Sequence, residues 1–257
     1  MIDLHCHVLP GIDDGPATID ESVALVRAAA ASGIREIVAT PHVSSHYPDN
    51  GPTNIPRLTS ELNERLRNEE IAVKIRTGAE INITRIGELT DKELSALALG
   101  GGQWLLVECP FAVHAPDFEA ILLYLKNKGH RILLAHPERS PLFQRDPRRL
   151  EALVVTGMLA SITAGSLVGR FGRDVRRFAM RLTADGLVHN VASDAHDVRR
   201  RPPGIAAEMA EAGLEDLTDW FAREVPQAIL SGETIPPRPT PTSRNRPKIQ
   251  RMRWRRR

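Results

Sequence analysis

The chain has 257 residues, of which 42% are hydrophobic, so it can fold as one large domain or as two small ones. Its two cysteines, Cys6 and Cys109, cannot build a disulfide framework and favour a reducing compartment. No run of 18 apolar residues is present to cross a membrane, and the first residues lack the basic end and apolar run of a signal peptide. We therefore expect a cytoplasmic protein.

Charge is distributed unevenly along the chain, although the net charge is only +2. Residues 236–257 hold nine of the 34 Lys and Arg and no acidic residue, which leaves 25 basic against 32 acidic residues elsewhere, a net charge of −7. An acidic body argues against a nucleic-acid-binding domain. We expect residues 1–235 to form one domain and residues 236–257 to be a disordered basic tail. The alternative for the tail, with its Trp254, is contact with an anionic membrane surface.

Seven short apolar runs alternate with amphipathic segments, in the pattern typical of βα repeats with parallel strands. The runs are residues 1–7, 35–42, 72–81, 103–110, 130–138, 157–165 and 187–196. Between the first two, Thr18 and Glu21 predict a helix that begins with a capping box, and Gly33 ends it. The helical segments 117–129 and 173–186 also end on glycine, and residues 205–231 are expected to be helical only.

Six of the seven runs end in residues that bind metals or phosphate: HCH, TPH, GAE, VEC, AHPER and SDAH. In a (β/α) barrel, the carboxyl ends of the strands form the active site. His5 and His7 lie two residues apart on one face of a strand, so they can converge on a cation, the alternative being a hydrogen-bonded histidine pair. In the turn PGIDDGP, we favour Asp14 as a ligand and assign Asp13 to the turn itself.

The other strand ends complete a set of nine candidate metal ligands. Buried carboxylates at strand ends need a cation or hydrogen-bond donors, although Glu80 and Glu108 can alternatively pair with arginines. The predicted ligands are His5, His7, Asp14, His42, Glu80, Glu108, His136, Asp194 and His196. Imidazole and carboxylate without thiolate suit Mn²⁺, Zn²⁺ or Fe, and nine ligands fit two or three ions.

Two arginines beside these ligands are candidates for binding phosphate. Arg139 and Arg201 carry guanidinium groups that match phosphate bidentately, with Arg199 and Arg200 as neighbours that can substitute. The alternative for all three of the later arginines is a solvated basic turn. Because clustered metals stabilise in-line displacement at phosphorus, the pattern predicts a metal-dependent phosphomonoester hydrolase.

These motifs, from HCHVLPGIDDGP to SDAH followed by RRPP, resemble the PHP (polymerase and histidinol phosphatase) superfamily over residues 1 to about 205. Within it they are most similar to the bacterial capsule and exopolysaccharide protein-tyrosine phosphatases. The resemblance implies a distorted (β/α)₇ barrel with a trinuclear metal centre built from the same nine ligands, and phosphate binding by Arg139 and Arg201. It also implies a homo-oligomer that dephosphorylates a tyrosine kinase controlling polysaccharide export.

Two other functions remain open: a histidinol-phosphate phosphatase, and a non-catalytic metal-binding regulator of polysaccharide assembly. A conventional thiol mechanism is disfavoured, because it needs an arginine six positions after the nucleophilic cysteine. Ile12 stands six positions after Cys6, and Ala115 six positions after Cys109. A tyrosine phosphatase built on this chain would therefore depend on its metals to activate water.

Overall fold

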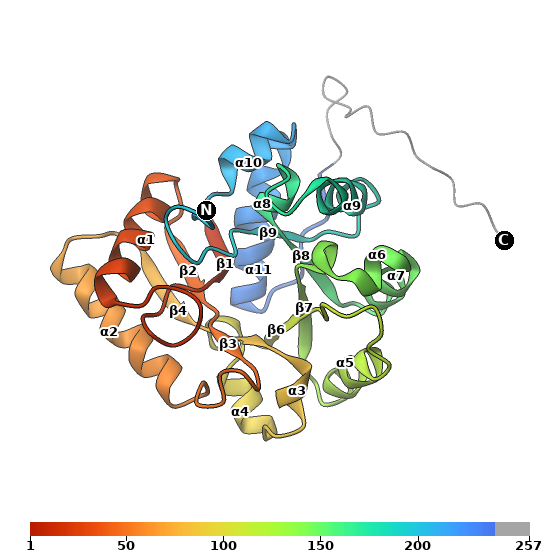
Figure 1. Ribbon diagram of the computed structural model, residues 1–257, viewed down its shortest axis with the longest axis horizontal. Helices are drawn as coiled ribbons and strands as arrows, with labels where there is room; N and C mark the ends of the chain where they lie inside the picture. Colours follow the sequence, from red (N-terminus) through yellow and green to blue (C-terminus); the bar gives the residue numbers. More distant parts are fainter. Residues whose placement is uncertain (240–257) are drawn as a thin grey trace.

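The computed structural model describes residues 1–239 (Figure 1). Most of the predicted basic tail, residues 240–257 with Trp254, lies outside the described residues, and so does its proposed membrane contact. In residues 1–239, none of the helices has both the length and the apolar character needed to span a bilayer.

The fold is α/β with parallel strands, as predicted, and the strands are divided between two sheets. One sheet has the order β1-β2-β4, formed by β1 (Ile2–Cys6), β2 (Glu36–Ala39) and β4 (Lys74–Thr77). The other follows chain order, with β3 (His42–Val43), β5 (Glu80–Ile81), β6 (Trp104–Glu108), β7 (Arg131–Ala135), β8 (Leu159–Thr163) and β9 (Asn190–Ala192). Every strand pair is parallel. β1, β6 and β8 are buried almost throughout, in keeping with parallel strands that are covered on both faces.

Two of the seven predicted strand runs are each divided into two short strands. Residues 35–42 form β2 and β3, separated by Thr40 and Pro41, and residues 72–81 form β4 and β5, separated by Gly78 and Ala79. Pro41 has no N–H group to continue a ladder. Gly78 lies so close to β2 that an added Cβ would be 2.6 Å from a methyl carbon of Val38. After each break the chain leaves the three-stranded sheet, and the second short strand, which carries His42 or Glu80, pairs in the six-stranded sheet.

The two sheets meet where the first and last strands end. Cys6 forms an isolated parallel bridge with Ala195. The His7 N–H donates to the Ala195 carbonyl at 2.9 Å, and the Asp194 N–H donates to the His5 carbonyl at 2.8 Å. The amino-terminal and carboxy-terminal parts of the site are therefore held side by side by the backbone.

Most of the helices lie around the strands, whereas α11 (Val225–Ser231) lies near the middle of the view in Figure 1. The helices are α1 (Ile19–Ala31), α2 (Asn54–Asn68), α3 (Ile83–Ile86), α4 (Asp91–Ala96), α5 (Phe118–Asn127), α6 (Pro141–Arg145), α7 (Pro147–Val155), α8 (Ala164–Leu167), α9 (Arg173–Ala184), α10 (Ala206–Glu211) and α11. As predicted, α1, α5 and α9 end just before glycines of positive φ: Gly33, Gly129 and Gly186. Residues 205–231 contain helical elements without strands, which was also predicted.

The predicted capping box of α1 is only half correct. The Glu21 N–H donates to the Thr18 hydroxyl, but the Glu21 carboxylate accepts from the Ala17 N–H at 2.7 Å instead of from Thr18. The carboxylate satisfies the amide one residue further back, so the reciprocal bond of the box is absent. A complete capping box is found instead at α4, between Thr90 and Glu93.

Candidate metal centre

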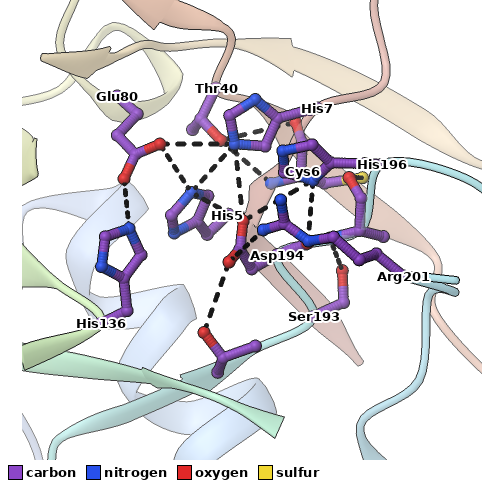
Figure 2. Close-up of polar contacts among 12 residues, drawn as sticks. His5, Cys6, His7, Thr40, Glu80, His136, Ser193, Asp194, His196 and Arg201 are labelled. Atoms are coloured by element: carbon purple, nitrogen blue, oxygen red, sulfur yellow. Dashed lines mark hydrogen bonds and ion pairs between the residues drawn. The ribbon is translucent and has the colours of Figure 1, made fainter. Parts of the chain in front are cut away.

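All nine predicted ligands gather at the ends of strands, although they are spread over nearly 200 residues of sequence. His5 is in β1 and His7 just after it, His42 begins β3, Glu80 begins β5, Glu108 ends β6, His136 follows β7, and Asp194 and His196 follow β9, with Asp14 in the loop before α1. Figure 2 shows six of them turned toward one another: His5, His7, Glu80, His136, Asp194 and His196.

The ligand atoms fall into four overlapping groups, in each of which they lie within 4.8 Å of one another. The groups are His7, Asp14, His42 and His196; His5, His7 and Glu80; His5, His136 and Asp194; and His42, Glu80 and Glu108. Four of the residues belong to two groups each, so the groups are contiguous. This arrangement suits adjacent cations that share ligands.

The histidine pair of β1 lies at the middle of this cluster. The Nε2 atoms of His5 and His7 are 3.2 Å apart. Both are 3.2–3.5 Å from Glu80 Oε2 and Asp194 Oδ1. Two imidazole nitrogens and two carboxylate oxygens thus surround one small volume, whereas a simple histidine pair in a strand needs no carboxylate.

The two aspartates of the PGIDDGP turn have different surroundings. Asp13 Oδ2 lies 2.7 Å from His7 Nδ1 and accepts the His42 N–H at 3.0 Å, while Oδ1 accepts the Gly15 N–H. Asp13 therefore closes the turn and directs the Nε2 atom of His7 into the cluster. Asp14 Oδ1 lies 3.5 Å from His42 Nε2 and 3.3 Å from His196 Nε2, in the position of a ligand.

Electrostatics in the cluster favour a positive charge among ionised carboxylates. Burial alone would raise the pKa of Glu80 and Asp194, but the neighbouring histidines, and Arg201 beside Asp194, hold both well below their usual values. Burial would lower the pKa of His7, yet Asp13, Asp194 and Glu80 raise it well above its ordinary value. The carboxylates thus remain charged in a buried place where only a cation or a protonated imidazole can balance them.

The donor atoms fit a metal ion in both chemistry and hydrogen bonding. Glu80 Oε2 and His196 Nε2 are buried and form no well-aligned hydrogen bond within residues 1–239. Both atoms contact charged or polar groups of the cluster at 3.1–3.4 Å, but a buried donor or acceptor without an aligned partner is stabilised when a cation binds it. All the donors are nitrogen or oxygen, whereas the thiols of Cys6 and Cys109 are buried outside the cluster with pKa values raised by burial.

Backbone strain marks two of the predicted ligands. Among residues 1–239, the non-glycine residues with positive φ are Glu70 (54°), His136 (35°) and Asp194 (51°). This region of conformational space costs a non-glycine residue about 1–3 kcal/mol and is found preferentially at functional sites. The ligand atoms of both residues lie within 4.8 Å of that of His5.

The two predicted phosphate-binding arginines converge on one carboxylate oxygen. Arg139 donates to Asp194 Oδ2 at 2.6 Å, and Arg201 forms an ion pair with the same oxygen at 2.5 Å. In contrast, Arg199 and Arg200 are exposed, and their backbone N–H groups are held by Asp197 at 2.6 Å. The structure therefore separates Arg201, at the edge of the cluster, from its two neighbours in the turn.

Comparison with known proteins assigns the chain to a family. A family model for capsular polysaccharide synthesis, CpsB/CapC, matches residues 1–219. The chain belongs to this family. It is 36% identical to the tyrosine-protein phosphatase YwqE of Bacillus subtilis (strain 168), over 93% of this chain and 96% of that protein. It is 34% identical to the putative tyrosine-protein phosphatase CapC of Staphylococcus aureus, over 79% of each. The family resemblance predicted from sequence is therefore confirmed.

Solved structures agree with the CpsB/CapC assignment. A chain from the crystal structures of YwqE from Bacillus subtilis and CpsB from Streptococcus pneumoniae, described as unique metal-dependent tyrosine phosphatases, matches with a TM-score of 0.83. It is 34% identical, with 94% of this chain and 100% of that one covered. A TatD-like protein from Archaeoglobus fulgidus shares the fold alone, with a TM-score of 0.52 at 16% identity.

Several residues that contact the candidate metal ligands were not predicted from the sequence. The Tyr47 ring stacks on His42 with centroids 5.9 Å apart, and Phe111 stacks on His136 at 5.3 Å. The Asn82 side chain donates to Glu108 Oε2 at 2.6 Å. These residues are in loops or beside short elements, where the periodic spacing of apolar residues that marks helices and strands is absent. The available signal was their position within a few residues of a polar strand end.

Proposed function

We propose that this chain is a metal-dependent protein-tyrosine phosphatase that acts on a tyrosine kinase regulating capsular or exopolysaccharide biosynthesis. The observation that carries the proposal is the convergence of nine nitrogen and oxygen ligands with two arginines at one place. Membership of the CpsB/CapC family, and relatives named as tyrosine phosphatases that align over most of their length, support the reaction.

The two sheets are, in this proposal, parts of one distorted seven-stranded barrel. In support of this, β2 and β3 come from one predicted strand segment, and β4 and β5 come from another. The nine observed strands therefore correspond to seven strands of a barrel. The bridge between Cys6 and Ala195 would close the barrel between its first and last strands. The carboxyl ends of the strands would then form a single rim that carries the metal ligands.

The nine ligands would hold two or three divalent ions, with Mn²⁺ preferred and Zn²⁺ or Fe as alternatives. His5, His7 and Glu80 form one candidate site; His7, Asp14, His42 and His196 a second; and His136 with Asp194 and His5 a third. When bound, such ions would lower the pKa of coordinated water and offset the negative charge of a phosphate. Glu108 would complete the cluster beside His42 and Glu80.

The protein groups around the metals have separate tasks. Arg139 and Arg201 hold the phosphoryl oxygens through charged N–H donors, which Asp194 keeps in place in the absence of substrate. Asp13 fixes the orientation of His7 through its Nδ1 atom. The tyrosine oxygen leaves as a phenolate, whose pKa of about 10 is low enough for departure without a dedicated general acid.

Phosphate release from a phosphotyrosine peptide and from histidinol phosphate tests this function, using Mn²⁺-reconstituted protein with and without chelator. Chelator-sensitive turnover that prefers the peptide is the expected result. Preference for histidinol phosphate would keep the metal site and change the substrate class. If the protein contains its metals but hydrolyses neither compound, the phosphatase proposal is wrong and a regulatory role takes its place.

The substitution Asp13→Asn is expected to reduce metal affinity and activity by about 10–100-fold, the usual effect of losing a partner that orients a metal-binding histidine. The neutral amide cannot hold the His7 Nδ1 proton as the carboxylate does. Metal titration and kcat/KM of Asp13→Asn should be compared with those of Asp14→Asn. Because Asp14 is assigned as a direct ligand, its variant should lose more; the reverse order would exchange the two roles.

A further inference from the structure

A pocket of about 660 Å³ adjoins the metal centre on the side of β3, β5 and β6. Its lining includes two candidate metal ligands, His42 and Glu108, and two aromatic residues, Tyr47 and Phe111. Phosphate bound at the cluster would therefore have its ester group within reach of this space. None of the roles proposed above uses the pocket.

Phe111 is an unusual side chain on the surface of this molecule. It is 53% exposed in the loop after β6, and Val113, two residues later, is 39% exposed. Its ring stacks on His136 at 5.3 Å and lies 5.2 Å from the guanidinium of Arg139. Phe111 thus contacts a predicted metal ligand and a predicted phosphate-binding residue, and it also lines the pocket.

A second aromatic ring reaches the pocket from a different loop. Tyr47 follows β3, and its ring is parallel to that of His42, with an interplanar angle of 3°. Ile83, Pro110 and Ala115 add apolar surface to the same pocket. Aromatic and apolar walls favour a planar aryl ligand, because ring pairs gain energy in stacked and edge-to-face arrangements beyond that of simple burial.

We infer that this pocket is the subsite for the aryl ring of phosphotyrosine, and that Phe111 determines the preference for aryl over alkyl phosphates. The inference rests on the proposed function and identifies the part of the site that recognises the ester group. The phosphate is held on the side of Arg139, and the phenyl ring lies along Phe111 in the pocket. A phosphoserine side chain has no ring to occupy this surface.

Phe111 also has a second contact that must be distinguished from this role. The Arg139 guanidinium lies between two rings, with Phe111 at 5.2 Å and Phe171 at 4.4 Å. Phe171 is not among the residues that line the pocket. Phe171→Ala therefore removes an aromatic contact to Arg139 without altering the pocket, and it is the matched control for Phe111→Ala. Tyr124, which is also 53% exposed but lies on α5, controls for loss of a surface ring.

The experiment measures binding of phenylphosphonate and methylphosphonate to Mn²⁺-loaded protein by calorimetry, together with kcat and KM for a phosphotyrosine peptide. For Phe111→Ala we expect phenylphosphonate to bind about tenfold more weakly and methylphosphonate to bind within about twofold of wild type. The KM for the peptide should rise more than kcat falls. Phe171→Ala should weaken both phosphonates equally, and Tyr124→Ala neither.

Equal weakening of both phosphonates in Phe111→Ala would mean that Phe111 acts through Arg139, and would overturn the inference. Unchanged binding of both would overturn it as well. Phosphonate binding does not require turnover, so the proposed function is judged separately. A wild-type protein that binds phenylphosphonate through Phe111 but hydrolyses no phosphotyrosine peptide would support the aryl pocket and contradict the phosphatase proposal.

Discussion

Asparagine in place of Asp194 is expected to lower phosphatase activity by about a thousandfold or more and to reduce the bound metal content. This carboxylate lies within 3.5 Å of the Nε2 atoms of both His5 and His7, and its other oxygen accepts from Arg139 and forms an ion pair with Arg201. The substitution preserves the shape of the side chain and removes its charge. The ligand and the anchor of both arginines are thus lost together, and each such electrostatic contact is worth about 10²–10³ in rate.

Glu138→Gln is the matched control for Asp194→Asn. Glu138 is also a buried carboxyl group in the same region, but it accepts from the Thr163 N–H and the Ser166 hydroxyl and belongs to none of the ligand groups. Burial raises the pKa of Glu138, in contrast to that of Asp194, so a neutral amide is a good replacement. We expect Glu138→Gln to keep its metal and activity within about threefold.

Metal analysis, kcat/KM and the thermal unfolding midpoint of both variants decide the outcome. An Asp194→Asn protein that is folded and inactive but has a full metal content would show that Asp194 positions the arginines and is not a ligand. Activity close to that of wild type would contradict both roles. A matching loss in Glu138→Gln would indicate a general disturbance of the buried region.

The convergence of the nine candidate ligands could be predicted from the sequence because strand ends are easy to recognise. Short buried strands give continuous apolar runs, and a polar motif at the end of each run is therefore conspicuous. Parallel strands bring those ends to one edge, so His42 and Asp194 could be placed near each other without knowledge of the contacts between them. The same reasoning predicted the parallel α/β fold.

Features that depend on side-chain direction could not be predicted in this way. The positive φ angles of His136 and Asp194 could not be predicted, because histidine and aspartate, although enriched among non-glycine residues in this region, adopt negative φ at most positions. The division of two runs into separate strands depends on the close approach of Gly78 to Val38, which is a tertiary contact. The incomplete capping box at Glu21 likewise depends on a local contact, since the Glu21 carboxylate accepts from the Ala17 N–H and not from the Thr18 N–H.

Aromatic residues beside the cluster were missed for a related reason. Phe111 is exposed and Tyr47 half-buried, both in loops, and an aromatic residue in a loop has no sequence pattern that separates it from other surface residues. Their significance comes from contacts with His136, Arg139 and His42. The sequence thus indicates the polar residues at strand ends better than the aromatic residues of the loops beside them.

Alanine in place of Arg201 is expected to lower kcat/KM for a small aryl phosphate by about 10²–10³-fold while the protein keeps its metals. Arg201 forms an ion pair with Asp194 Oδ2 at 2.5 Å, and its buried Nε has no hydrogen-bond partner within residues 1–239, which leaves a donor for a phosphoryl oxygen. Arg200→Ala is the matched control. It removes the same charge one residue earlier, from an exposed side chain, and should change kcat/KM by less than about threefold.

Inhibition by inorganic phosphate provides the binding measurement for these two variants. The inhibition constant should increase about tenfold or more in Arg201→Ala and remain near the wild-type value in Arg200→Ala. If Arg200→Ala shows the larger loss, the phosphate is held by the exposed turn, and the assignment to Arg201 is wrong. Arg201 contacts the candidate ligand Asp194, but a guanidinium group cannot itself bind a cation. Loss of metal from Arg201→Ala would therefore contradict a role limited to phosphate binding.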